Sequence, residues 1–164
     1  MKTITKTYNI YKFDELSKAI QEKLIQDEEE NIRQADVEWF LADEMGERAI
    51  HLLKENFGEK AIFKKVYYSL CYRQGDGAII EFDLEYYNKN IKIRHDGGHY
   101  YHKRSFKIIS DNLTEKQENR LKEKIITINK KLADYGYEFI ECDRTAQAIE
   151  QLNNYEFYEN GDIC

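Results

Sequence analysis

The sequence predicts an α+β fold, in which helices pack on one face of an antiparallel meander of four to five strands. Apolar and acidic side chains alternate from Ala78 to Tyr87, which is the period of a half-buried strand. Apolar residues also recur every three to four positions from Leu121 to Tyr135, which is the period of an amphipathic helix. Strands in the middle of the chain and helices on either side favour a sheet whose apolar face is covered by helices.

Length and composition favour one folded domain over residues 1–164. The 164 residues are 41% apolar and 13% aromatic, which argues against disorder. The chain has no apolar run near the ~18 residues that span a bilayer, and residues 1–6 lack the apolar core of a secretory signal. The cysteines Cys71, Cys142 and Cys164 have no metal-binding spacing and are expected to be reduced thiols in a cytoplasmic protein.

The N-terminal third is predicted to be a strand followed by helices. Thr3–Lys12 alternates loosely and indicates the strand. Asp14 is an N-cap for an amphipathic helix that reaches about Asp27. A second helix is expected from about Gln34 to Asn56. The polar segment 27–31 predicts a joint between them, and one long bent helix is the alternative.

The middle of the chain predicts the meander itself. Phe63–Arg73 is rich in aromatic and β-branched residues, and Asp76-Gly77 after it is a hairpin signal. The strand Ala78–Tyr87 comes next, then a strand at 91–95 and, after a Gly97-Gly98 turn, a strand at Tyr100–Ser110. The alternation in the strand Ala78–Tyr87 divides its side chains into a buried set and an exposed set. Buried side chains are expected at Ile80, Phe82 and Leu84, and exposed ones at Glu81, Asp83 and Glu85.

The C-terminal third is predicted to return to helix. Thr114 and Gln117 match a capping box, and the helix that follows is expected to end near Gly136. Residues 137–142 are open between strand and continued helix. Asp143 is a candidate cap for a short helix, and Tyr155–Tyr158 indicates a final strand.

A histidine cluster is the first candidate for chemistry. A two-residue turn at Gly97-Gly98 would place His95 and His102 on one face of the hairpin, with their backbones roughly 7–8 Å apart. His99 would lie on the other face. Such a hairpin supplies two ligands at most, whereas a catalytic zinc takes three from the protein. We therefore expect no metal, no cofactor and no catalytic residue. The alternative is a metal-dependent nuclease or hydrolase that uses His95 and His102 with a carboxylate such as Asp76.

Charge is unevenly distributed along the chain. The net charge is −6, yet residues 14–59 carry −9 and residues 60–110 carry +5. A globally acidic protein is a poor nucleic-acid binder. Acidic residues recur every seven positions at Glu15, Glu22, Glu29, Asp36 and Asp43. Four more lie beside them: Glu28, Glu30, Glu44 and Glu47. On one continuous helix this stripe would face a basic protein surface. A solvated helix face is the alternative.

Four stretches of the sequence carry a resemblance. They are residues 11–19 (YKFDELSKA), 68–77 (YSLCYRQGDG), 95–102 (HDGGHYYH) and 155–161 (YEFYENG). Their order and spacing resemble a family of small accessory proteins from phages and mobile elements of low-GC bacteria. Some of these proteins look like anti-CRISPR proteins, which are small inhibitors that bind a type II CRISPR effector nuclease. The resemblance implies a phage-borne protein in the cytoplasm of a host bacterial cell, and it transfers no catalytic residue.

These observations together predict a non-enzymatic inhibitor of a host CRISPR effector nuclease, bound as the protein or as its guide-RNA complex. The acidic helical residues would engage the nuclease, with Tyr100 and Tyr101 as aromatic anchors. We expect no direct contact with nucleic acid or membrane, while self-association is possible. Besides the metal-dependent enzyme, a structural or regulatory phage protein without a nuclease target is the other alternative.

Overall fold

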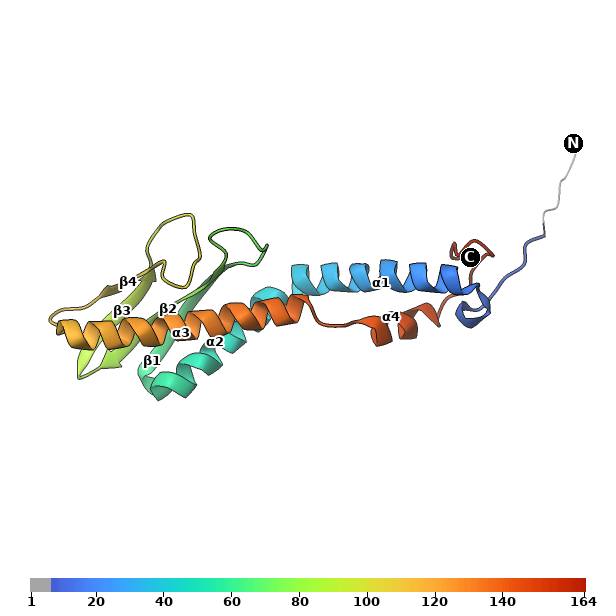
Figure 1. Cartoon of the computed structure of the whole chain (residues 1–164). Coiled ribbons are helices and arrows are strands. Elements are labelled where there is room, and N and C mark those ends of the chain that lie inside the picture. The colour runs from blue at the N-terminus through green and yellow to red at the C-terminus, as the bar shows by residue number, and fades with distance from the viewer. Residues whose placement is uncertain (1–6) are drawn as a thin grey trace, which may run out of the picture. The chain divides into compact units, whose positions relative to one another are not determined.

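The computed structural model describes residues 7–164 and is α+β (Figure 1). Its contacts divide the chain into two compact units. The helical unit consists of the residues up to Trp39 together with Cys142–Cys164, and the sheet unit is Phe40–Glu141. The expectation of one domain over residues 1–164 stays a prediction, and its test is whether both units unfold in a single transition.

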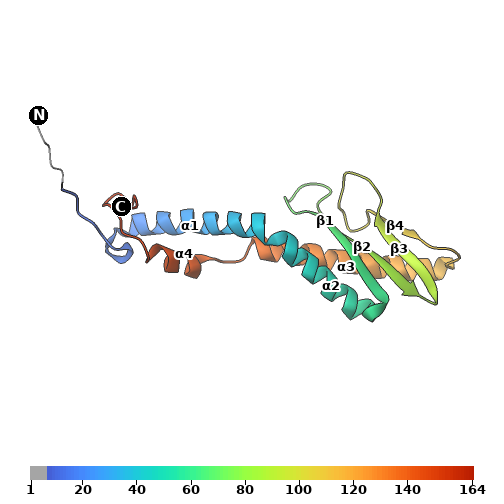
Figure 2. The ribbon, with the colours of Figure 1, turned by 180° about the vertical axis from the view of Figure 1, so that it is seen from behind.

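The sheet unit contains a four-stranded antiparallel meander, which confirms the predicted fold class. The strands are β1 (Ala61–Ser69), β2 (Gly77–Tyr86), β3 (Lys89–His95) and β4 (Phe106–Ile109), and they lie in sequence order across an open sheet. Helix α2 (Leu41–Phe57) and a 3-10 turn (Gly58–Lys60) precede the sheet, and α3 (Glu115–Ile140) follows it. In Figure 2 the strands lie in front of α3.

One face of this sheet forms the core of the unit, as the alternation of β2 predicts. Ile80, Phe82 and Leu84 are buried, and α2 and α3 pack against the sheet. The helices contribute to the core Met45, Ala49, Leu52 and Leu53 from α2, and Leu121, Ile125, Ile128 and Leu132 from α3. Buried Asn129 of α3 accepts a hydrogen bond from the Ile80 amide at 3.2 Å and donates to the Lys103 carbonyl. These two bonds fix α3 against the sheet.

The helical unit contains α1 (Lys18–Trp39) and α4 (Thr145–Leu152). The predicted joint at 27–31 is wrong, because α1 runs through it without interruption. Glutamates have high helix propensity, Glu30 pairs with Arg33, and Ile32, directly after the segment, is buried. The chain leaves the helix only at Phe40, before α2.

The core of the helical unit is small. Its main cluster of buried side chains is Phe13, Leu16, Leu152 and Phe157, with partly buried Tyr11, Ile20, Leu24, Ile25 and Ile149 around them. Ile32 of α1 and Ala148 of α4 are also buried. The strand expected at Thr3–Lys12 lies partly outside the described residues. Within residues 7–164, neither it nor Tyr155–Tyr158 forms a regular strand. They meet only in isolated bridges that join Tyr11, Phe157 and Ile163.

Two other predicted boundaries are displaced by packing. Helix α3 does not end at Gly136, because this glycine serves close approach instead. A Cβ there would lie 2.5 Å from Leu70 and 2.9 Å from Met45. The strand expected from Tyr100 begins only at Phe106, because residues 96–105 form a loop. Among residues 7–164, the helices are all too short or too polar to cross a membrane.

Candidate functional site

Two loops of the sheet unit form the candidate site, which we call the loop platform. They are residues 70–76 between β1 and β2, and residues 96–105 between β3 and β4, at the same end of the sheet (Figure 1). The Tyr101 amide donates to the Gly75 carbonyl at 3.0 Å. Gly75 has φ +95°, and a Cβ on it would lie 2.0 Å from the Tyr100 ring. Only glycine therefore allows the two loops to meet.

Asp76 holds the first loop in shape. Its carboxylate accepts hydrogen bonds from the Arg73 amide at 2.8 Å, the Ser69 hydroxyl at 2.7 Å and the Cys71 amide at 2.6 Å. The Arg73 amide, followed by Ser69, lowers the pKa of this carboxyl below its usual range. Asp76 is therefore a positioning residue for the loop.

The predicted histidine hairpin is wrong in register. His95 is paired with Phe106 and Ile93 with Ile108, so the turn is ten residues long and not two. The Asp96 amide closes it by donating to the Ser105 carbonyl at 3.1 Å, while Tyr101 is drawn to Gly75. His95 and His102 are consequently not a cross-strand pair.

The imidazole of His95 is part of the loop structure. The centroid of its ring lies 5.1 Å from the centroid of the Tyr67 ring and 5.4 Å from that of the Tyr101 ring. Nδ1 accepts from the Gly97 amide at 3.3 Å, and Nε2 lies 3.1 Å from the Tyr100 carbonyl. An imidazole with its proton on Nε2 satisfies both contacts. Across residues 7–164, histidine, cysteine and carboxylate side chains nowhere gather in a group of three that could hold a metal ion.

The outward side of the platform is aromatic. Tyr100 is 60% exposed and Tyr72 is 66% exposed. Tyr72 has φ +56°, and its ring packs on Tyr137 at 4.6 Å between centroids. Tyr101 is half-buried within the stack of Tyr67 and His95. Sequence reasoning missed Tyr72, although it lies in one of the stretches that carry the resemblance.

The predicted acidic stripe is divided among a 3-10 turn (Phe13–Glu15), which holds Glu15, and the helices α1 and α2. Part of the stripe has partners of its own. Asp36 forms an ion pair with Arg144 at 2.7 Å, and Glu29 accepts from the Thr145 hydroxyl. Both positions are half-buried, so they do not belong to a freely exposed stripe that could face a basic surface. Glu15 accepts from the Lys12 amide at 2.8 Å, while Glu22 is exposed on α1.

The remaining acidic candidates lie in the sheet unit. Asp43 and Glu47 are exposed on α2. Glu44 accepts a hydrogen bond from the Tyr135 hydroxyl at 2.6 Å, and this bond raises the pKa of Tyr135 to about 12. The free acidic surface is thus narrower than the heptad spacing predicts.

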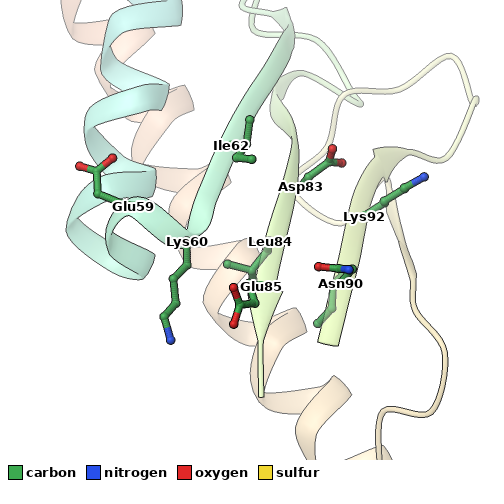
Figure 3. A pocket seen from close by; sticks show the side chains of 9 residues that line it. Glu59, Lys60, Ile62, Asp83, Leu84, Glu85, Asn90 and Lys92 are labelled. Atoms are coloured by element: carbon green, nitrogen blue, oxygen red, sulfur yellow. The ribbon is translucent and has the colours of Figure 1, made fainter. Parts of the chain in front are cut away.

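A hollow of about 410 Å³ lies on the face of the sheet opposite the one that packs on α2 and α3 (Figure 3). Its lining includes Lys60, Ile62, Asp83, Glu85, Asn90 and Lys92. The lining mixes charges of both signs around one exposed aliphatic side chain.

No family model, curated protein or solved structure matches the chain. The functional argument therefore depends on the residues and on their geometry.

Proposed function

We propose that the protein is a non-enzymatic inhibitor that binds a host defence nuclease, most specifically a type II CRISPR effector, through the loop platform. One observation carries the proposal. Two of the four stretches that resemble phage accessory proteins, residues 68–77 and 95–102, are distant in sequence and meet in this platform. The platform presents Tyr72 and Tyr100 at its surface.

The chemistry of the platform suits a protein interface. Interface binding energy is concentrated in tyrosine, tryptophan and arginine side chains, and Arg73 lies exposed beside Tyr72. The Asp76 carboxylate and the Gly75–Tyr101 bond already fix both loops, so binding would order few additional residues. Such preorganisation lowers the entropic cost of association.

Two of the three side chains that the enzyme alternative needs, His95 and Asp76, have structural partners. Both ring nitrogens of His95 contact the backbone of its own loop. Asp76 accepts three hydrogen bonds. These contacts support a binding role for the platform over a catalytic one.

The proposed partner is the nuclease alone or its guide-RNA complex, in the cytoplasm of a host bacterium. The exposed carboxylates of Glu22, Asp43 and Glu47 would steer the protein toward a basic surface, since charges at a rim mainly raise association rates. Blocking a groove that normally holds nucleic acid, or locking a mobile nuclease domain, would account for inhibition.

The test is DNA cleavage by purified type II effectors with and without the full chain, together with the dissociation constant. The variant Tyr72→Ala/Tyr100→Ala should bind at least about 30-fold more weakly, since one hot-spot side chain contributes about 2 kcal/mol or more. Tyr155→Ala is the matched control, because Tyr155 is exposed in the helical unit. Undiminished inhibition by the double variant would refute the platform, and no inhibition across several effectors would refute the target.

A further inference from the structure

The outer face of the sheet, opposite the face that packs on α2 and α3, carries side chains that the loop platform does not use. The strand register places in one row Ile62, Asp83, Lys92 and Ile109, one from each strand. Directly paired residues of antiparallel strands point to the same face. Because Asp83 alternates with buried Phe82, the whole row belongs to the outer face.

This row presents two aliphatic side chains with a cation between them. Ile62 is 58% exposed and Ile109 is 49% exposed, on the two edge strands. Lys92 is exposed and forms no ion pair within residues 7–164. Asp83 is already neutralised, by Arg94 at 2.5 Å and Lys64 at 3.3 Å. The charge that remains for a ligand on this row is therefore positive.

Neighbouring positions strengthen this imbalance. Lys107 is paired with Arg94 across β3 and β4, is exposed, and has no ion pair in the described chain. Lys60 is likewise exposed and unpaired at the start of β1. On the acidic side, the Glu81 carboxylate accepts a hydrogen bond from the His95 amide at 2.9 Å, and exposed Glu59 lies 3.8 Å from the Lys54 ammonium. Glu85 is then the exposed carboxylate of β2.

The hollow of Figure 3 joins these groups into one surface. Lys60, Ile62, Asn90 and Lys92 line it, together with the carboxylate residues Glu59, Asp83 and Glu85. A volume of about 410 Å³ accommodates a few side chains of a bound segment.

We infer that the outer face docks an acidic segment of a partner protein. The carboxylates of the segment would lie at Lys60, Lys92 and Lys107, and its apolar side chains on Ile62 and Ile109. The inference rests on the proposal that this protein acts by binding another protein, and it adds a second surface with a stated partner chemistry. Charge complementarity decides the occupant.

Nucleic acid fits this face less well than an acidic peptide. A continuous phosphate backbone would pass the carboxylates of Glu81, Asp83 and Glu85 in the centre of the sheet, whereas a peptide can space its charges to avoid them. The exposed apolar side chains of the row, Ile62 and Ile109, are also aliphatic, so they offer no ring on which a base could stack.

The test uses the full chain labelled with ¹⁵N and a 12-residue peptide of alternating Glu and Leu. Amide shifts should change on β1, β3 and β4 around Ile62, Lys92 and Ile109, and they should weaken as salt is raised. A peptide of alternating Lys and Leu should leave these amides unchanged. The variant Lys92→Glu/Lys107→Glu should lose the response, and Lys116→Glu/Lys130→Glu, which alters exposed lysines of α3, should keep it.

Several outcomes would overturn the inference. They are equal shifts with the lysine peptide, an unchanged response of the Lys92→Glu/Lys107→Glu variant, or no response at all. A 12-nucleotide single-stranded RNA that shifts the same amides more strongly would make nucleic acid the occupant. Shifts that depend on protein concentration without peptide would make a second copy the occupant. Nuclease inhibition is measured separately, so a chain that inhibits without binding the peptide loses only this inference.

Discussion

The sheet unit and the helical unit differ in the internal contacts that stabilise each of them. The sheet unit buries one continuous apolar face of four strands under two helices. The helical unit has a cluster of four buried apolar side chains that includes Phe157, with Ile32 and Ala148 buried outside it. It adds an ion pair between Asp36 and Arg144, whose side chain is 7% exposed. Removing one partner of a buried ion pair leaves an uncompensated charge, and a small core has less apolar burial to offset that cost.

Charge separates the two units as clearly as the core does. Residues 7–39 and 142–164 carry 14 acidic and 5 basic side chains, a formal charge of −9. The sheet unit carries 17 acidic and 18 basic side chains, a charge of +1. Part of the acidic charge of the helical unit serves its own packing, so charge density alone does not identify a binding surface.

The largest expected change in unfolding free energy comes from substitutions that disrupt one of the two cores at a time. Phe82→Ala and Phe157→Ala each remove a fully buried ring and should cost about 3–5 kcal/mol of unfolding free energy. The two free energies are measured by denaturant unfolding, with hydrogen exchange of the amides in each unit as the readout. If residues 1–164 form one cooperative domain, either variant shifts a single transition. Two transitions, with Phe157→Ala shifting only that of the helical unit, would contradict the single domain.

A smaller effect tests the ion pair of the helical unit. Asp36→Asn removes the carboxylate that neutralises buried Arg144, and it should cost about 1–3 kcal/mol. Glu22→Gln, a change of the same kind at an exposed position of α1, should stay within about 0.5 kcal/mol. Equal thermal midpoints for the two variants would show that Asp36 only belongs to a solvated face.

The smallest effect concerns the loop platform at low pH. The folded state lowers the pKa of Asp76 below its usual 3.8, so the ionised carboxylate stabilises the loop at neutral pH and this contribution is lost as pH falls through the folded pKa. Below about pH 4, the Cys71 and Arg73 amides should therefore lose protection relative to amides that do not bond to Asp76. Asp76→Asn should show fast exchange at every pH. Identical pH profiles for both proteins would contradict the role of Asp76.

Sequence alone predicts the parts of the fold that depend on local periodicity. Strand β2 keeps its expected faces because every second residue from Ala78 is apolar, and α3 keeps its apolar seam. The predicted joint at 27–31 is wrong because a polar run does not by itself end a helix, and glutamate is a strong helix former.

The candidate site was harder to predict because its contacts are distant in sequence. The same holds for the acidic candidate Asp36 in the helical unit, because its partner Arg144 lies 108 residues away and no spacing on α1 reveals it. The Gly97-Gly98 pair is typical of a tight hairpin, yet residues 96–105 form a long loop because Tyr100 and Tyr101 contact Gly75 in another turn. Tyr100 was predicted as an anchor and is exposed, whereas Tyr101 is half-buried in the aromatic stack.

The most direct test of the central claim compares the two units within the bound complex. Hydrogen exchange of the full chain is measured with and without an inhibited type II effector. The account predicts that the strongest new protection falls on amides of residues 70–76 and 96–105 in the loop platform. Protection confined to the helical unit, with both loops exchanging as in the free protein, would contradict it.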